Sequence, residues 1–403
     1  MKQKLQSTCE STARKLRSTR GSSLRSGYVK IGVDVFVSLS TSKMYAIFSF
    51  LFVGTFVSIF QVSYAMTTSN STPPAIFIFG DSTADVGTNS FLPLTKIRAD
   101  FPHNGIDFLN SRPTGRFSNG FNSADFLSKL MGRERSPQPY LFLLKAGLTK
   151  RMFSGVNFAS ASSGLLDVTG KYLNIVSMSD QIKQFETVCS NLTSVKGRDV
   201  AKNILAKSMI AISIGSNDIF NYFEIRSTVD PVVFINSLMT AYECHINDLY
   251  DLGARKFGII SVAPIGCCPS QRIHNTTGGC LEIENTFARA FYSSLDALLK
   301  KLTSKLPGMK YALGNSYEMT INVIDHPQLF NFKSVDKACC GEGLLNAEKT
   351  CTPQANLCSE RDRYLFWDLY HPTQYASQLA AATLYNGGPQ FVTPINFAQL
   401  AAY

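Results

Sequence analysis

Histidine is scarce in this chain of 403 residues, with only five, and its cysteines lack the spacing of a metal site. No two cysteines form a CxxC pair, and six residues separate Cys351 from Cys358. Structural zinc sites combine closely spaced Cys and His ligands, so the sequence does not favour zinc. The shortage of histidine also limits any catalytic base of that type to five positions.

Positive charge is concentrated at one end of the chain. Residues 1–43 hold nine Lys or Arg and two acids, a net of +7 out of the +10 of the whole chain, which leaves +3 for the remainder. A remainder so close to neutrality gives no indication of nucleic-acid binding. The first 43 residues are rich in Ser and Arg, as organelle transit peptides are. We interpret them instead as an upstream extension outside the fold, with Met44 as the natural start.

Charged side chains are absent from residues 44–65. This segment follows Lys43, has an almost wholly apolar core, and ends in Ser63-Tyr64-Ala65, with small residues at the two positions that a signal peptidase reads. These are the features of a secretory signal, so we predict export to the cell exterior or cell wall. The core is short for a membrane span, and an anchor formed by residues 45–62 is the alternative.

Export would place most of the cysteines in an oxidising compartment, because nine of the ten follow residue 65. Disulfides are therefore expected, and since nine is an odd number, one cysteine should be free. Three N-glycosylation sequons fit the same destination; they begin at Asn70, Asn191 and Asn275. We assign residues 66–403 to one folded domain, which we expect to be a monomer.

Short apolar runs alternate with helical patterns from residue 75 onward. The runs predict strands at 75–79, 155–160, 209–214, 257–262 and 310–314. Apolar residues at helical spacing predict helices at 122–130, 178–188, 231–252, 281–305 and 373–385. This alternation is typical of βαβ units, so we predict an α/β fold with a parallel sheet between two layers of helices. Residues 325–365 hold four cysteines and are predicted to form a loop pinned by disulfides.

Ser82 comes just after the first predicted strand, in the segment GDSTAD at residues 80–85. In parallel α/β sheets, ligands bind beyond the carboxyl ends of the strands. The turn at 160–164 and Asn217 also follow such ends. A serine hydroxyl is a poor nucleophile unless a base lies within hydrogen-bond reach and another group orients that base. Ser82 is therefore a candidate nucleophile that needs both partners from elsewhere in the chain.

Spacing distinguishes the candidate bases. His371 follows Asp368 by three residues, so one turn of chain can bring the carboxylate to the imidazole ring. His326 directly follows Asp325, and adjacent side chains tend to point apart. The other three lie in a predicted helix or in polar loops: His245, His103 and His274. His371, oriented by Asp368, is the candidate base.

Acyl transfer also needs donors for the negative charge that develops on the carbonyl oxygen. The backbone N–H of Ser82, a backbone N–H in the turn after Ala159 and the side-chain amide of Asn217 are candidates. A lone Asn after a strand is also a common turn or cap residue, so the residues alone leave the role of Asn217 open.

Taken in order, these segments resemble the blocks of the GDSL esterase/lipase family (SGNH hydrolases). The blocks are GDSTAD at 80–85, VNFAS at 156–160, GSND at 215–218 and DLYHP at 368–372. Three further segments are similar to the secreted plant branch: GRFSNG at 115–120, CCG at 339–341 and FWD at 366–368. The resemblance spans about residues 75–390. It implies a flavodoxin-like, three-layer α/β/α fold with five parallel strands, and no need for a metal or other cofactor.

The resemblance also implies roles for the site residues. Ser82 would attack an ester carbonyl, and His371 would take its proton and pass it to the leaving alcohol. Asp368 would orient His371. The oxyanion would be held by Asn217 and by the backbone N–H groups of Ser82 and Ser162.

Two positions depart from the family pattern. The family usually has two glycines after the Ala-Ser of the second block, where this chain has Ala161 and Ser162. The backbone N–H at position 162 can still donate a hydrogen bond when Ser replaces Gly, provided that Ser162 can adopt the φ that the turn requires. Thr83 stands in place of the usual Leu and is expected to affect only local packing. We expect Asp81 to shape the loop by accepting from backbone N–H groups, and the turn at 116–120 to be structural.

The sequence therefore predicts a secreted serine esterase/lipase that hydrolyses carboxylic esters through an acyl-enzyme. One alternative is a transacylase of the cutin-forming type, which passes the same acyl group to an alcohol. Another is a non-catalytic extracellular binding protein on the same scaffold. Lipid, cutin, acetylated polysaccharide and phenolic esters all fit as substrates, because specificity lies in loops that the motifs do not describe. Transient contact with a membrane or the cell wall is expected, and nucleic acid is not.

Overall fold

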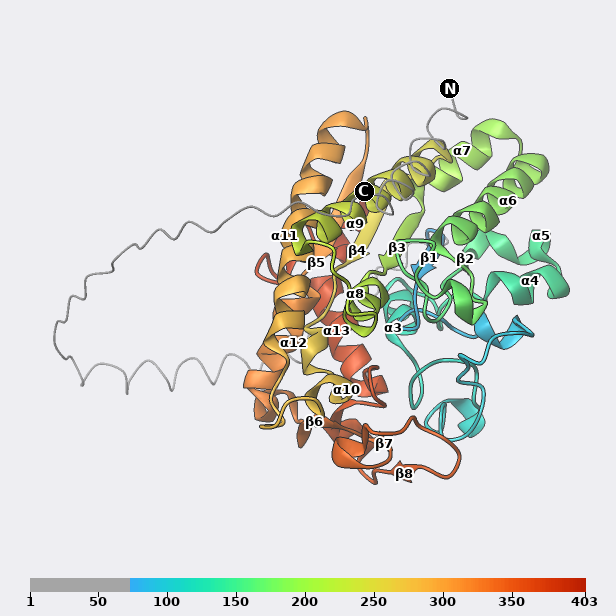
Figure 1. The fold of residues 1–403 in the computed structure, drawn as a ribbon. Helices are drawn as coiled ribbons and strands as arrows, with labels where there is room; N and C mark the ends of the chain where they lie inside the picture. The colour runs from blue at the N-terminus through green and yellow to red at the C-terminus, as the bar shows by residue number, and fades with distance from the viewer. Residues whose placement is uncertain (1–72) are drawn as a thin grey trace, which may run out of the picture. The chain divides into compact units, whose positions relative to one another are not determined.

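A central β-sheet organises residues 73–403, the part of the chain that the computed structural model describes (Figure 1). Its strand order is β10-β5-β4-β3-β1-β2. Five of the strands run parallel: β1 (Ile76–Gly80), β2 (Gly155–Asn157), β3 (Met209–Ser213), β4 (Lys256–Ile260) and β5 (Lys310–Gly314). The parallel five-stranded sheet is thus confirmed. A two-residue antiparallel edge strand, β10 (Val392–Thr393), was not predicted because two residues show no periodicity.

Three sequence predictions fall on residues outside the described part. They are the basic extension at 1–43, the signal segment at 44–65 and the sequon at Asn70. Within residues 73–403, no helix has both the length and the apolar character that crossing a membrane requires.

Side chains of β1 show why both faces of the sheet are buried. Phe77 and Phe79 belong to one hydrophobic core, and Ile76 and Ile78 to a second one. Successive side chains of a strand point to opposite faces, so the two cores lie on the two sides of the sheet. The other strands and the helices that cover both faces supply the rest of the two cores, which gives the three-layer α/β/α fold that the sequence predicted.

The five predicted helices are all present. They are α3 (Ser123–Leu130), α6 (Met178–Lys196), α9 (Pro231–Asp251), α11 (Glu282–Lys305) and α13 (Gln374–Asn386). Helix α6 runs past its predicted end at 188 because Leu192 extends its buried face, and Gly197 then ends it. The pattern missed seven shorter helices: α4 (Tyr140–Ala146), α5 (Leu148–Arg151), α7 (Arg198–Lys207), α8 (Ser216–Glu224), α10 (Pro269–Arg272), α12 (Ser316–Asp325) and α14 (Phe397–Ala402).

Most helices contribute buried side chains to one of the two cores, although α12 contributes to both. The core that contains Phe77 draws buried side chains from α4, α6, α7, α9 and α11. The core that contains Ile76 draws them from α3, α13 and α14. Helix α13 therefore lies on the same side of the sheet as α3, and it begins just after the predicted base, His371.

The region at 325–365 contains short paired strands rather than a simple loop. Strand β6 (Ser334–Ala338) pairs with β9 (Tyr364–Phe366), and β7 (Cys340–Gly341) pairs with β8 (Asn356–Leu357). Disulfides pin this region as expected, through the pairs Cys339–Cys358 and Cys340–Cys351.

Cysteine pairing corrects one prediction. A third disulfide joins Cys267 to Cys280. Within the described residues both Cys189 and Cys268 are free and buried, so the expectation of a single free cysteine was wrong. Cys244 is also disulfide-bonded, so the nine cysteines do not pair only among themselves and their odd number does not fix how many are left free.

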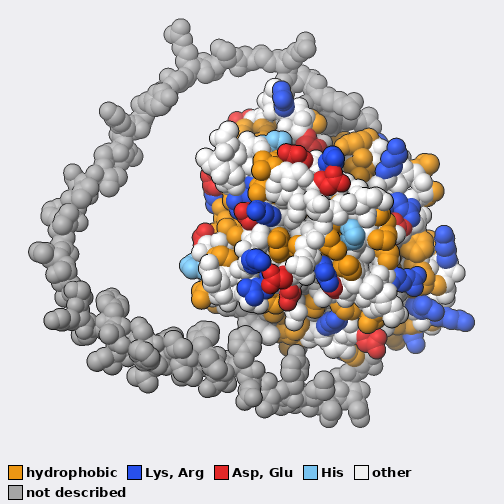
Figure 2. All heavy atoms as spheres, turned by 90° about the horizontal axis from the view of Figure 1, so that it is seen from below, with side chains coloured by type: hydrophobic (Ala, Val, Ile, Leu, Met, Phe, Trp, Pro, Cys, Tyr) orange, Lys and Arg blue, Asp and Glu red, His pale blue; other side chains and the backbone are white. Residues whose placement is uncertain are grey.

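Surface charge is mixed. Figure 2 views the molecule from the end at which β7 and β8 lie in Figure 1, and on this face Lys and Arg side chains are interspersed with Asp and Glu. Such a surface agrees with the small net charge that remains after the basic N-terminal segment is set aside.

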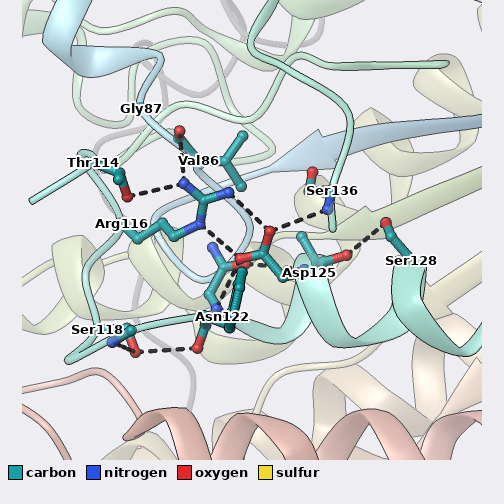
Figure 3. A network of polar contacts seen from close by, with 12 residues as sticks. Val86, Gly87, Thr114, Arg116, Ser118, Asn122, Asp125, Ser128 and Ser136 are labelled. Carbon is teal, nitrogen blue, oxygen red and sulfur yellow. Dashed lines mark hydrogen bonds and ion pairs between the residues drawn. The ribbon is translucent and has the colours of Figure 1, made fainter. Parts of the chain in front are cut away.

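A buried ion pair fixes the long connection between β1 and α3 (Figure 3). Arg116 donates from Nε to Oδ2 of Asp125 at 2.6 Å and from a terminal nitrogen to Oδ1 at 2.8 Å. Asp125 also accepts from the backbone N–H groups of Asn122 and Ser136. Asn122 in return caps the helix by accepting from Asp125 N–H. Arg116 therefore has the structural role expected of its turn, whereas Phe117 of the same turn lines the cleft described below.

Replacing Arg116 by Met is expected to lower the free energy of unfolding by about 3–5 kcal/mol, because it leaves Asp125 buried without its counter-charge. Urea unfolding followed by circular dichroism would measure the change. Lys301→Met is the control: its pair with Glu243 is half exposed, so the loss there should stay below about 1 kcal/mol. Equal losses in both variants would contradict the prediction.

Candidate active site

Ser82 lies two residues beyond the end of β1, and the turn that leads to it requires a glycine at position 80. Gly80 has a φ of +147°, and a Cβ at this position would lie 2.1 Å from the carbonyl oxygen of Ser213 on β3. Any larger residue would therefore push the two strands apart. Asp81 then accepts from the backbone N–H of Thr83 at 2.9 Å, which is the loop-shaping contact expected of it. The turn brings Ser82 to the carboxyl edge of the sheet.

Ser82, His371 and Asp368 form a continuous chain of hydrogen bonds. Ser82 Oγ lies 2.7 Å from His371 Nε2, and His371 Nδ1 lies 2.8 Å from each carboxylate oxygen of Asp368. Asp368 Oδ1 also accepts from the backbone N–H groups of Tyr370 and His371. These bonds fix the carboxylate, and the carboxylate fixes the ring.

The opposite charges of His371 and Asp368 shift the pKa values of both side chains. Burial alone would lower the pKa of His371, but the negative charge of Asp368, its hydrogen bond and the more distant Asp81 raise it above the ordinary 6.5. Burial alone would raise the pKa of Asp368, but the charge of His371 and hydrogen bonds from three donors lower it below 3.8. Each partner thus favours the charged form of the other.

The other four histidines lie away from Ser82. His245 is buried in α9, with Nε2 3.0 Å from the carbonyl oxygen of Leu165. His326 and His274 are exposed, and His103 is half-buried in the loop before α3. Spacing to an aspartate therefore selected the one histidine that contacts Ser82.

The turn after β2 is held by two buried carboxylates. Asp85 accepts from the backbone N–H of Ala161 at 3.1 Å. Asp218 accepts from the N–H groups of Leu165 at 2.7 Å and Leu166 at 3.1 Å. Burial raises the pKa of both carboxyl groups to about 6, although their hydrogen bonds act in the opposite direction. The two carboxyl groups anchor the turn at its two ends.

Ser162 lies at the exposed point of this anchored turn. Its φ is +67°, in the left-handed region that glycine adopts more readily, and it lines the same cleft as Ser82 and His371. Within residues 73–403, the backbone N–H groups of Ser82 and Ser162 find no acceptor in the protein. The third expected donor, Asn217, stands in the first turn of α8 and uses one amide N–H to bond the carbonyl of Ser163 at 3.0 Å.

The sequence reasoning missed two polar side chains that support the nucleophile turn. Gln181 accepts from Gly80 N–H and donates to Gly80 C=O, both at 2.9 Å. The sequence did contain an indication of this role, since Gln181 is a polar residue on the apolar face of a predicted helix. Thr83 was expected to affect packing only, but its hydroxyl donates to Asp81 at 2.8 Å and lies 3.0 Å from Ser213 Oγ. Thr83 therefore acts through hydrogen bonds, because the carboxylate of Asp81 and the hydroxyl of Ser213 both lie within reach of its own hydroxyl.

A cleft of about 820 Å³ opens over these residues. Phe117 forms part of its wall and packs on His371, with ring centroids 5.0 Å apart. Among the described residues no cluster of three or more His, Cys, Asp or Glu could hold a metal ion. Of the two sequons in this part of the chain, Asn191 lies half-buried on α6 and Asn275 in the loop after α10.

Asp368→Asn is expected to lower the pKa of His371. The carboxylate raises that pKa, and without its charge burial favours the neutral imidazole. Titration of the His371 ring by NMR would measure the change. Asp325→Asn, an exposed change beside His326, should leave the pKa of His371 where it is in the unmodified protein. An unchanged His371 pKa in Asp368→Asn would contradict the prediction.

Comparison with known proteins shows the family to which the chain belongs. The sequence model of the family described as GDSL-like Lipase/Acylhydrolase matches residues 76–384. The chain is 36% identical over 353 residues to GDSL esterase/lipase At1g71250 of Arabidopsis thaliana, an alignment that covers 85% of this chain and 93% of that protein. It is 35% identical over 340 residues to GDSL esterase/lipase 6 of the same plant, covering 83% and 92%. The chain therefore belongs to the GDSL-like lipase/acylhydrolase family and is a hydrolase that acts on ester bonds.

Proposed function

We propose that this hydrolase cleaves carboxylic esters by covalent catalysis, with Ser82 as nucleophile, His371 as base and Asp368 as the orienting acid. The observation that carries the proposal is the unbroken hydrogen-bond chain from Ser82 Oγ through His371 to Asp368, at the wall of the cleft. A nucleophile, a base within reach and a third group that orients the base are the parts that such catalysis needs.

The reaction follows from these contacts in two stages. Ser82 Oγ bonds to the ester carbonyl carbon while its proton moves to His371 Nε2. The bond between carbon and the alcohol oxygen then breaks, and His371 returns the proton to that oxygen, which leaves an acyl-enzyme. Water attacks the acyl-enzyme with the same proton transfers and releases the acid. Only neutral imidazole can accept the first proton, so the raised pKa of His371 moves the acidic limit of activity above 6.5.

Negative charge on the carbonyl oxygen is stabilised by three donors in this proposal. They are the backbone N–H groups of Ser82 and Ser162 and the free amide N–H of Asn217. The first two support the assignment because the protein itself gives them no acceptor within the described residues. The buried carboxylates of Asp85 and Asp218 keep the turn that carries Ser162 in place, so the donors need no rearrangement during the reaction.

We further propose that the hydrolase acts outside the cell as a monomer, on or near the cell wall or a membrane surface. The proposed arrangement is an extension at 1–43, a cleaved signal at 44–65 and the hydrolase domain at 66–403. The disulfides among residues 73–403, such as Cys339–Cys358, support an oxidising destination. Glycans at Asn70, Asn191 and Asn275 belong to the same proposal.

Ser82→Ala is expected to reduce kcat for a p-nitrophenyl ester on the order of 10⁶-fold, as loss of the nucleophile does in a well-studied serine protease. The same change should abolish covalent labelling by a fluorophosphonate probe. Ser123→Ala is the matched control, because Ser123 lines the same cleft without a histidine partner. Full ester hydrolysis by the Ser82→Ala protein would overturn the proposal.

Asn217→Ala should lower kcat by about 10²–10³-fold, the cost of losing one oxyanion donor, with a smaller effect on KM. Steady-state kinetics on the same ester would separate the two constants. Asn221→Ala is the control, since Asn221 lies one turn further along α8 and also lines the cleft. A change confined to KM would assign Asn217 to substrate binding instead.

A further inference from the structure

Strand β1 extends beyond the end of its neighbour β2. β2 pairs with Ile76–Ile78 of β1 and ends at Asn157. Beyond that point, Ser160 N–H donates to the carbonyl oxygen of Gly80 at 3.0 Å. The N–H of Gly80 donates to the side chain of Gln181 rather than to a strand. A side-chain amide therefore takes the place of a neighbouring strand where the chain turns towards the proposed nucleophile.

Gln181 joins the end of β1 to the turn that follows β2. It lies near the start of α6 and is fully buried. Its Oε1 accepts from Gly80 N–H at 2.9 Å, and its Nε2 donates to the Gly80 carbonyl oxygen at 2.9 Å. The same Nε2 donates to the hydroxyl of Ser163 at 3.1 Å. One buried amide thus contacts both the turn that carries Ser82 and the turn that carries Ser162.

Ser163 extends this contact to the third proposed oxyanion donor. Its hydroxyl lies 2.8 Å from the carbonyl oxygen of Gly80 and 2.7 Å from that of Ser160. Its own carbonyl oxygen accepts from the side-chain amide of Asn217 at 3.0 Å. Gln181 and Ser163 are both fully buried, and hydrogen bonds in a dry interior are electrostatically stronger than in water. The nucleophile and the proposed donors are therefore held by one buried hydrogen-bond network.

The spacing of the two turns decides whether one substrate carbonyl group can meet both. In the proposed reaction, Ser82 Oγ bonds to the carbonyl carbon while the N–H of Ser162 donates to the oxygen of the same group. Oxyanion donors act from about 2.7–3.1 Å, and a displacement of about 1 Å can reduce the rate about 10²-fold. Asp85 joins the two turns on the C-terminal side of Ser82. Gln181 completes the connection on the N-terminal side.

We propose that Gln181 is a positioning residue for ester hydrolysis, which fixes the distance between Ser82 Oγ and the proposed oxyanion donors through Gly80 and Ser163. This inference rests on the function proposed above. Gln181 is fully buried and lies outside the set of described residues that line the cleft, so it does not touch the ester. Its loss should therefore lower kcat and kcat/KM equally, as the loss of an interaction made only in the transition state does.

Gln181→Met tests this role on the full chain, because it keeps the length of the side chain and removes its polar atoms. We expect kcat for a p-nitrophenyl ester to fall between about 10-fold and 10²-fold, with KM little changed. Counting reactive sites with a fluorophosphonate probe corrects kcat for protein that has not folded. Full kcat per reactive site in Gln181→Met would overturn the proposal.

Gln184→Met is the matched control for this measurement. Gln184 lies about one turn further along α6 and is half-buried, and its amide oxygen has no hydrogen-bond partner within residues 73–403. The identical change there should leave kcat as it is in the unmodified protein. An equal fall of kcat in both variants would assign the effect to the packing of α6 and overturn the proposal.

A second variant distinguishes positioning from a purely structural role. Gln181→Glu keeps the shape of the side chain, and its protonated carboxyl still offers one acceptor and one donor, whereas the carboxylate offers no donor. Burial raises the pKa of such a carboxyl group. The ratio of kcat in this variant to kcat in the unmodified protein should therefore rise towards one as the pH falls. A ratio that stays as low as that of Gln181→Met at every pH would overturn the proposal.

A third variant keeps the proposal testable if both Gln181 variants fail to fold. Ser163→Ala removes the hydroxyl that Gln181 contacts and should likewise lower kcat with little change in KM. Full kcat in folded Gln181→Met, or in folded Ser163→Ala, would reject the positioning role and leave the proposed function standing. An unmodified protein that hydrolyses no ester would reject both.

Discussion

Two buried carboxylates hold the turn on which the rest of the site depends. Asp85 and Asp218 reach this turn from different strand ends and accept the N–H groups of Ala161, Leu165 and Leu166. Hydrogen bonds to a charged group contribute about 1.5–3 kcal/mol each, which offsets part of the cost of burying the two charges. With the turn anchored at both ends, the N–H of Ser162 stays at the cleft near Ser82.

The other half of the site comes from the far end of the chain. His371 lies 289 residues beyond Ser82 and contacts it at 2.7 Å. Its loop is fixed by a bond from Trp367 N–H to the His371 carbonyl at 2.7 Å, and the Trp367 indole donates to Asn104 at 2.9 Å. Thr373 then caps α13. Since residues of that helix also line the cleft, the segment that positions His371 also shapes the cleft.

Local pattern predicted the sheet and the histidine that contacts Ser82 well, and predicted the residues that support this contact poorly. Five apolar runs are enough to define five parallel strands, because each run must be buried on both faces. Three-residue spacing singled out His371 because a carboxylate one turn away can reach an imidazole ring. By contrast, Gln181 supports Ser82 from about a hundred positions away, and no local pattern reports such a distance. Thr83 likewise acts through Ser213, on another strand.

The sequence by itself determined which residues come together with Ser82 and at which edge of the sheet they meet, since strand ends and short motifs are local properties. Tertiary structure alone decided which cysteines pair, which backbone N–H groups lack an acceptor, and that one face each of α12 and α13 lines a cleft. Helical periodicity shows that a face is apolar. Whether that face packs against a neighbour or borders a cavity depends on how far apart the two helices are held, and contacts distant in sequence set that separation.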